Sequence, residues 1–178
     1  MNLEKYQQYS RIARGLEKAD LVLKDARIVN VFTEEIIRGD IAIQDGIIAG
    51  IGSFHGKEER DLAGRYVCPG FIDSHLHLES TLVTPAELVT VASRHGTTTF
   101  IVDPHESANV SGLAGIDYIL DQTEDVKANV YVMMPSCVPA TAIDDNGCTL
   151  TAEDMAPYLH NSRILGLGEV MDSISVVQ

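Results

Sequence analysis

The residues best suited to do chemistry lie in the segment Asp73-Ser-His75-Leu-His77-Leu-Glu79, which ends an apolar run. Alternate residues of a β-strand share one face, so the two histidines and the acidic residues beside them are expected to point the same way. Two neutral imidazoles at this spacing can bind one divalent ion, and a nearby carboxylate adds charge or orients a ring. A lone histidine is more often packed in the core, but this pair at a strand end favours a metal site.

A second apolar strand ends in Asp103-Pro104-His105-Glu106. Asp-Pro often opens a turn, and the residues ESANVSG that follow are typical of a loop. His105 and Glu106 are nevertheless predicted to be catalytic, because ionisable groups gather where a buried strand becomes a loop. Contact with substrate and transfer of a proton both remain open as their roles.

A fourth strand ends in Gly166-Leu-Gly168-Glu169. An acidic residue that closes an apolar strand is costly to bury unless it is paired or bound to a metal. In register with the strand end that carries His75 and His77, Glu169 is the predicted carboxylate that bridges a pair of metal ions.

A cysteine lies at the end of the third strand, in Pro135-Ser-Cys137-Val-Pro-Ala-Thr. Its prolines and its position suggest a nucleophile, yet no dedicated base can be recognised in the sequence. A free cysteine is most often a small buried hydrophobic residue. Cys137 is therefore predicted to form a rigid wall of the site. The remaining histidines are predicted to be structural: His55, His95 and His160.

The composition excludes several classes of protein. The chain has 178 residues, a net charge of −13 and 45% hydrophobic residues, so it can bury a core and is not disordered throughout. The acidic excess argues against nucleic-acid partners. No apolar run is long enough for a membrane span, and the N-terminus lacks the apolar stretch of a signal peptide. Three cysteines without a CxxC pair indicate neither a disulfide framework nor a zinc ribbon. We expect a soluble, cytoplasmic protein.

Three regions are expected along the chain. Residues 1–18 resemble a surface helix, and residues 19–67 contain short β-branched runs typical of a small, antiparallel, β-sandwich-like lobe. Asp45-Gly46 is a strong hairpin signal within that lobe. Residues 68–178 alternate between strands and helices, which predicts a parallel α/β sheet. The predicted strands are 70–78, 97–104, 129–137 and 163–171, and the predicted helices are 85–96, 111–126 and 151–160.

A complete (β/α)8 barrel needs about 250 residues. The chain after Gly70 is less than half that long and has room for four βα units. Either the sheet is small and open, or it is the first half of a TIM-type barrel. The ionisable residues at the strand ends favour a metal-dependent half-barrel, since barrel active sites form at that end.

The segment PGFIDSHLHLES resembles the first-strand motif of the amidohydrolase superfamily. Three further blocks, HGTTTFIVDPHESANV, PSCVPAT and GLGEVM, occur in the order found in the adenine deaminase family. The upstream segment from ARGLEKADLVL to IIAGIG also resembles the N-terminal region of that family. The resemblance covers essentially the whole chain, and the four blocks in order are highly specific.

The resemblance implies that His75 and His77 are metal ligands and that Glu169 bridges two ions. Members of the family are similar in using manganese or iron, and zinc is an alternative. By resemblance, a metal-bound hydroxide would attack C6 of adenine, and ammonia would leave to give hypoxanthine in purine salvage. The metal lowers the pKa of water and stabilises developing charge.

The family's barrel continues beyond the matched blocks and supplies further histidine ligands and a late aspartate. Two histidines and one carboxylate cannot complete a binuclear site, so the chain is expected to be partial and inactive alone. It would form a homo-oligomer or pair with a C-terminal half. A cyclic-amide hydrolase remains an alternative, although such enzymes use a carbamylated lysine and no lysine follows Lys127. A non-catalytic half-barrel that binds a partner is the other alternative.

Overall fold

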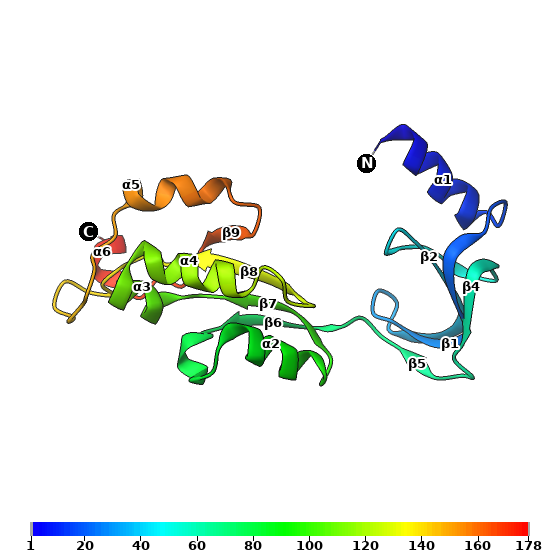
Figure 1. Cartoon of the computed structure of the whole chain (residues 1–178), viewed down its shortest axis with the longest axis horizontal. Helices are drawn as coiled ribbons and strands as arrows, with labels where there is room; N and C mark the ends of the chain where they lie inside the picture. Colours follow the sequence, from blue (N-terminus) through cyan, green and yellow to red (C-terminus); the bar gives the residue numbers. More distant parts are fainter. Residues whose placement is uncertain (1, 178) are drawn as a thin grey trace. The chain divides into compact units, whose positions relative to one another are not determined.

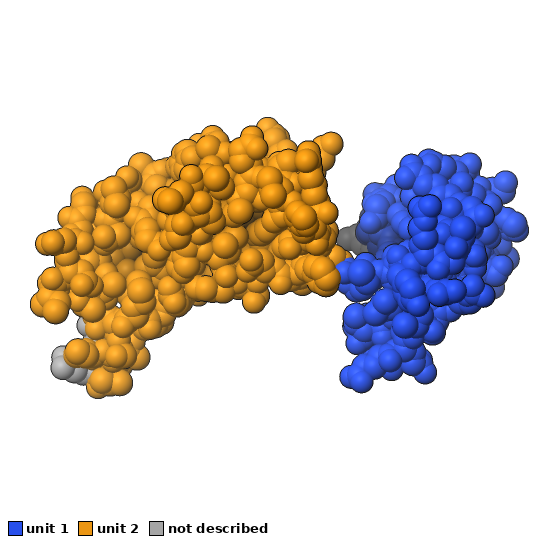
Figure 2. Space-filling view, turned by 90° about the horizontal axis from the view of Figure 1, so that it is seen from below, with its two compact units in different colours: residues 1–69 blue, residues 70–178 orange. Residues whose placement is uncertain are grey.

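The computed structural model describes residues 2–177. The chain forms two compact units, Met1–Pro69 and Gly70–Gln178 (Figure 2). Each unit has its own sheet and its own buried apolar core. Among the described residues there is no helix with the length and apolar character needed to cross a membrane.

The first unit begins with helix α1 (Leu3–Ala13). Its N-terminus is capped by the Asn2 side chain, which accepts a hydrogen bond from the backbone N–H of Lys5 at 2.9 Å. The helix buries Ile12 completely against the sheet residues of the same unit. Gly15 follows with φ of +71°, which suits the glycine that commonly ends a helix.

The sheet of the first unit is mixed, whereas the sequence pattern predicted an antiparallel lobe. The central strand β1 pairs antiparallel with β2 but parallel with both β4 and β5, so the antiparallel prediction is wrong for these last two strands. The predicted hairpin is present, and Asp45 and Gly46 both have positive φ in the turn between β2 and β3. The strands are β1 (Ala19–Asn30), β2 (Glu35–Gln44), β3 (Ile47–Gly52), β4 (Gly56–Asp61) and β5 (Tyr66–Val67).

The second unit contains a parallel sheet of four strands in the order β6-β7-β8-β9, with helical segments in the connections (Figure 1). The predicted α/β class and the four parallel strands are confirmed. The strands are β6 (Phe71–Leu76), β7 (Thr97–Val102), β8 (Asn129–Met134) and β9 (Ile164–Leu167). The helical segments are η1 (Glu79–Thr81), α2 (Pro85–Ser93), α3 (His105–Ser111), α4 (Leu113–Gln122), α5 (Ala152–Met155), η2 (Ala156–His160) and α6 (Ser173–Val177).

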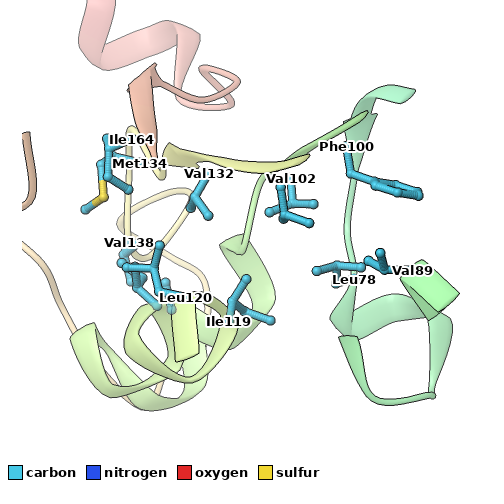
Figure 3. Packing of buried hydrophobic residues seen from close by; sticks show 13 residues of the cluster. Leu78, Val89, Phe100, Val102, Ile119, Leu120, Val132, Met134, Val138 and Ile164 are labelled. Carbon is cyan, nitrogen blue, oxygen red and sulfur yellow. The ribbon is translucent and has the colours of Figure 1, made fainter. Parts of the chain in front are cut away.

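The core of this unit lies where alternate strand residues meet helices α2 and α4. Phe100, Val102 and Val132 point into it from the strands, and Val89 and Ile119 pack there from the helices (Figure 3). Strand burial alternates, with buried residues separated by partly exposed ones. The amino-acid sequence makes both faces of these strands apolar. Among the described residues, however, only one face of the sheet is fully buried.

Helix α3 was not expected, because its sequence HESANVS reads as a loop. Serine, asparagine and valine are weak helix formers, so tertiary contacts must stabilise the helix. Ala108 is fully buried in the core, and Gly115 of α4 lies so close to Ser107 that a side chain would collide with its backbone carbonyl. Packing therefore overrides local propensity at the segment that carries His105.

We expect the Tyr158→Phe variant to be about 1 kcal/mol less stable at pH 7, because Tyr158 Oη donates a 2.6 Å hydrogen bond to Asp117. Burial and the Asp117 carboxylate raise the pKa of Tyr158 to about 12. This contribution is complete below about pH 10, the ordinary tyrosine pKa, and is lost as pH rises towards 12. Urea unfolding at pH 7 and pH 11.5 measures the contribution of this hydrogen bond to the free energy of unfolding. The exposed Tyr118, changed to phenylalanine, is the control, and an equal loss in both variants would contradict the prediction.

Candidate metal centre

Two histidines and one glutamate meet beyond the C-terminal ends of the parallel strands. Strand β6 ends at Leu76 and presents His75 and His77, whose Nε2 atoms lie 3.1 Å apart. Glu169 follows β9, and its carboxylate oxygens lie 3.8 Å from His75 Nε2 and 3.4 Å from His77 Nε2. The three candidate ligand atoms all lie within 4.8 Å of one another.

This donor set fits a divalent ion. Zinc–nitrogen bonds of about 2.0–2.1 Å place two ligand atoms of a tetrahedral ion roughly 3.3 Å apart, close to the observed separation of the two Nε2 atoms. The carboxylate of Glu169 supplies negative charge on the same side of both rings. Side chains that are 24–50% exposed leave room for an ion and its other ligands.

Glu106 lies beside Nδ1 of His77, on the side of the ring away from His75 and Glu169. Its Oε2 lies 3.2 Å from His77 Nδ1, while its Oε1 accepts a 2.9 Å hydrogen bond from Ser80 Oγ. A carboxylate at Nδ1 holds the ring proton on that nitrogen and leaves the Nε2 lone pair for the ligand side.

Glu79 supports the helix that carries Glu106. Its Oε1 accepts backbone hydrogen bonds from Glu106 at 3.1 Å and Ser107 at 3.2 Å, the first free N–H groups of α3. Burial and the neighbouring Glu106 carboxylate raise the pKa of Glu79. Burial opposes ionisation of Glu106 as well, but its neighbours Glu79 and Ser80 lower its pKa overall.

The buried Asp103 contacts both the His105 ring and the backbone of Glu169. It is 1% exposed, its Oδ1 lies 2.6 Å from Nδ1 of the buried His105, and its Oδ2 accepts a 2.9 Å hydrogen bond from the backbone N–H of Glu169. Gly168 approaches so closely that a side chain there would collide with the Asp103 carboxylate. Burial lowers the pKa of His105, but Asp103 and Cys137 outweigh it and raise the value.

A cavity of about 530 Å³ opens beside these groups. His77, His105, Glu106 and Glu169 line it together with Cys137. All five site residues predicted from the sequence therefore lie at one end of the sheet, and four of them line one cavity.

The expectation that alternate residues from Asp73 to Glu79 share one face of a strand is wrong for Glu79. Strand β6 stops at Leu76, so Glu79 falls in the turn η1 and caps α3 instead. Asp73 accepts a hydrogen bond from the backbone N–H of His75 and belongs to no metal-sized cluster of the described residues. Asp103 was not among the site residues predicted from the sequence. A carboxylate directly after a buried strand is the pattern that could have identified it.

Comparison with known proteins gives the family. A model of the amidohydrolase family matches residues 66–170, which include His75, His77 and Glu169. The chain belongs to the amidohydrolase family. Its members are metal-dependent, in agreement with the cluster of imidazoles and carboxylates at the strand ends.

Several amidohydrolases named adenine deaminase are similar to this chain. The protein from Desulfitobacterium hafniense is 58% identical over 177 residues, covering 99% of this chain and 31% of the relative. The protein from Geobacillus kaustophilus is 52% identical over 155 residues, covering 87% of this chain and 27% of the relative. The chain thus spans about a third of the length of these relatives.

A solved structure supports the amidohydrolase fold. The N-acyl-D-glutamate deacylase of Bordetella bronchiseptica, in complex with zinc and a phosphonate inhibitor, superposes with a TM-score of 0.54 at 22% identity. The match covers 79% of this chain and 34% of the deacylase. It agrees with the interpretation of the second unit as part of a barrel.

Proposed function

We propose that this chain is part of a metal-dependent adenine deaminase, which hydrolyses adenine to hypoxanthine and ammonia. The observation that carries the proposal is the 58% identity over 177 residues to a protein of that name. The site supports it with a donor set suited to a hydrolytic metal.

His75, His77 and Glu169 would hold the metal, with Glu169 in the bridging position of a binuclear centre. A bound divalent ion lowers the pKa of water and stabilises negative charge that develops in the reaction. Glu106 lies beside His77 Nδ1 and would hold the ring proton on that nitrogen, which would leave the opposite nitrogen as a ligand.

We assign catalytic roles to His105 and Glu106, which both line the cavity. His105, with its pKa raised by Asp103, is suited to give a proton to a leaving amino group. Glu106, whose pKa is lowered by its neighbours, is suited to accept a hydrogen bond from the purine or a proton from water. The His105 ring lies against the Asp103 carboxylate, and the Glu106 carboxylate accepts a hydrogen bond from Ser80.

A binuclear centre needs more ligands than two imidazoles and one carboxylate. We propose that further ligands come from residues outside these 178, in a chain of the relatives' length or in a partner copy. In this proposal residues 1–18 form an N-terminal helix, 19–67 a β lobe and 68–178 four βα units of the barrel. Manganese, rather than iron or zinc, is the proposed metal, and purine salvage in the cytoplasm the proposed setting.

A chimera tests the function. In the Desulfitobacterium hafniense relative, the 177 aligned residues are replaced by this chain, and the product is loaded with manganese. We expect release of ammonia and hypoxanthine from adenine. The same chimera with His95→Ala, an exposed histidine outside the cluster, is the control. A folded, metal-loaded chimera that leaves adenine unchanged would refute the proposal.

We expect the Glu106→Gln variant to bind manganese about 10–100-fold more weakly, because the neutral amide holds the His77 ring less firmly. Titration calorimetry on the 178-residue chain measures the affinity. Glu87→Gln, an exposed change in the first turn of α2, is the matched control. Equal affinities in the two variants would show that Glu106 does not orient His77.

A further inference from the structure

A loop of residues 139–148 forms one wall of the cavity beside the candidate metal centre. It follows strand β8 and ends at an antiparallel bridge between Val138 and Leu150, where the Leu150 N–H donates a 3.0 Å hydrogen bond to the Val138 carbonyl. The loop residues Asp144 and Asp145 both line the cavity. A compact surface loop whose two ends lie close together is frequently functional.

Asn109 of helix α3 holds this loop in place. Its backbone carbonyl accepts hydrogen bonds from the N–H groups of Gly147 at 2.9 Å and Cys148 at 3.2 Å. Its side-chain Nδ2 donates a 3.2 Å hydrogen bond to the Asp145 carbonyl. Gly147 lies so close to α3 that a side chain there would collide with the Val110 carbonyl oxygen. The loop is therefore fixed to the same helix that carries the two predicted catalytic residues.

The loop brings negative charge to the cavity. Asp144 and Asp145 add two carboxylates to the lining, and no lysine or arginine lines the cavity among the described residues. The lining histidines, His77 and His105, each have a nitrogen within 3.2 Å of a carboxylate, which offsets any positive charge on them. Asp144 is fixed by hydrogen bonds of 2.9 Å from the N–H and the hydroxyl group of Thr141. The Asp145 side chain has no such partner in the described part of the chain, so its charge is available to a ligand.

His105 indicates that a polar ligand enters this cavity. Its side chain is 7% exposed, and Nε2 is buried without a hydrogen-bond partner within the part of the chain that the structure describes. A buried polar atom without a partner is costly. Nε2 is therefore available to a polar group of a ligand in the cavity that His105 lines.

We propose that the 139–148 loop is a charge filter, which admits neutral or cationic ligands to the cavity and disfavours anionic ones. Asp145 is the specificity-determining residue, and Asn109 is the positioning residue that holds the loop. Like charges brought together at a binding site cost affinity, and selection among ligands often depends on such repulsion. A site for a divalent ion would otherwise attract phosphates and carboxylates. The inference rests on the proposed function in one respect, since the ligand admitted would be a neutral purine.

Alkylation of Cys137 measures the filter, because this thiol lines the same cavity and needs neither metal nor substrate to react. Iodoacetamide and iodoacetate are nearly equal in size, but only iodoacetate carries a negative charge. Residue-resolved mass spectrometry of the 178-residue chain, in low-salt buffer at pH 8, gives the ratio of the two labelling rates at each cysteine. We expect the preference for iodoacetamide to be about fivefold greater at Cys137 than at the exposed Cys68.

Two variants assign the cause. Asp145→Asn is expected to lower the preference for iodoacetamide at Cys137 about threefold, because one negative charge leaves the lining. Asp125→Asn removes an equal charge from an exposed position outside the cavity and should leave the preference unchanged. Asn109→Ala removes the side-chain hydrogen bond to the loop, so it should raise both labelling rates and lower the preference. Asn129→Ala, an exposed change at the start of β8, is the control for Asn109→Ala.

A preference at Cys137 no greater than at Cys68, or one that Asp145→Asn leaves unchanged, would overturn the proposal. If Cys137 reacts with neither reagent, Ala140→Cys places a second thiol in the same lining, and the preference at that thiol decides. Circular dichroism checks that the variants fold; if Asn109→Ala does not, the Asp145→Asn comparison decides alone. Because the result is read as mass on a metal-free chain, failure here is distinct from failure to deaminate adenine.

Discussion

His77→Ala is expected to abolish retention of a divalent ion while leaving the fold unchanged. His77 is the centre of the cluster, because Nε2 faces both His75 and Glu169 while Nδ1 faces Glu106. Removing it leaves one imidazole and one carboxylate, which cannot converge on an ion with useful affinity. A metal ligand contributes more to metal affinity than a group that only orients a ligand. We therefore expect the affinity for the ion to fall by more than about 100-fold.

Metal content after gel filtration, measured by plasma mass spectrometry, tests this expectation. The His160→Ala variant removes an exposed histidine of the same unit and is the matched control. Far-UV circular dichroism should be the same for both variants, since the His77 side chain contributes to no buried apolar cluster of the described residues. Unchanged metal stoichiometry in the His77→Ala variant would refute the ligand assignment.

Asp103→Ala is expected to lower the free energy of unfolding by about 1–3 kcal/mol, the usual cost of leaving a buried polar group without its partner. The substitution leaves the buried His105 ring without its carboxylate and the Glu169 backbone N–H without its acceptor. It also opens a space beside Gly168, where the chain packs against the carboxylate.

Urea unfolding at pH 7, followed by circular dichroism, measures the difference. Asp125→Ala removes an exposed carboxylate and should change stability by no more than about 0.5 kcal/mol. An Asp103→Ala variant as stable as this control would mean that the Asp103–His105 pair contributes nothing net. Because Asp103 holds the backbone of Glu169, the variant should also bind manganese more weakly than the control.

Both predictions concern the same end of the sheet, where strand termini distant in sequence are brought together. His77 follows β6, Asp103 follows β7 and Glu169 follows β9. The parallel order β6-β7-β8-β9 places these strand ends along one edge of the sheet. Ionisable residues that are far apart in sequence therefore lie close together there.

The amino-acid sequence by itself determined the α/β class and the four parallel strands of the second unit, and it singled out the histidines and the glutamate of the candidate metal centre. Patterns within short segments of the sequence are enough to predict these features. Apolar runs with helical segments between them predict parallel strands, and the ends of parallel strands lie along one edge, which predicts that Glu169 comes close to His75 and His77.

Tertiary structure alone decided the remaining features, because they depend on contacts between residues distant in sequence. The strands β4 and β5 lie parallel to β1, a choice of neighbour that no local pattern encodes. Helix α3 forms from a loop-like sequence because Glu79 caps it. Cys137 and His105 follow different strands, and only the fold brings them to the lining of one cavity.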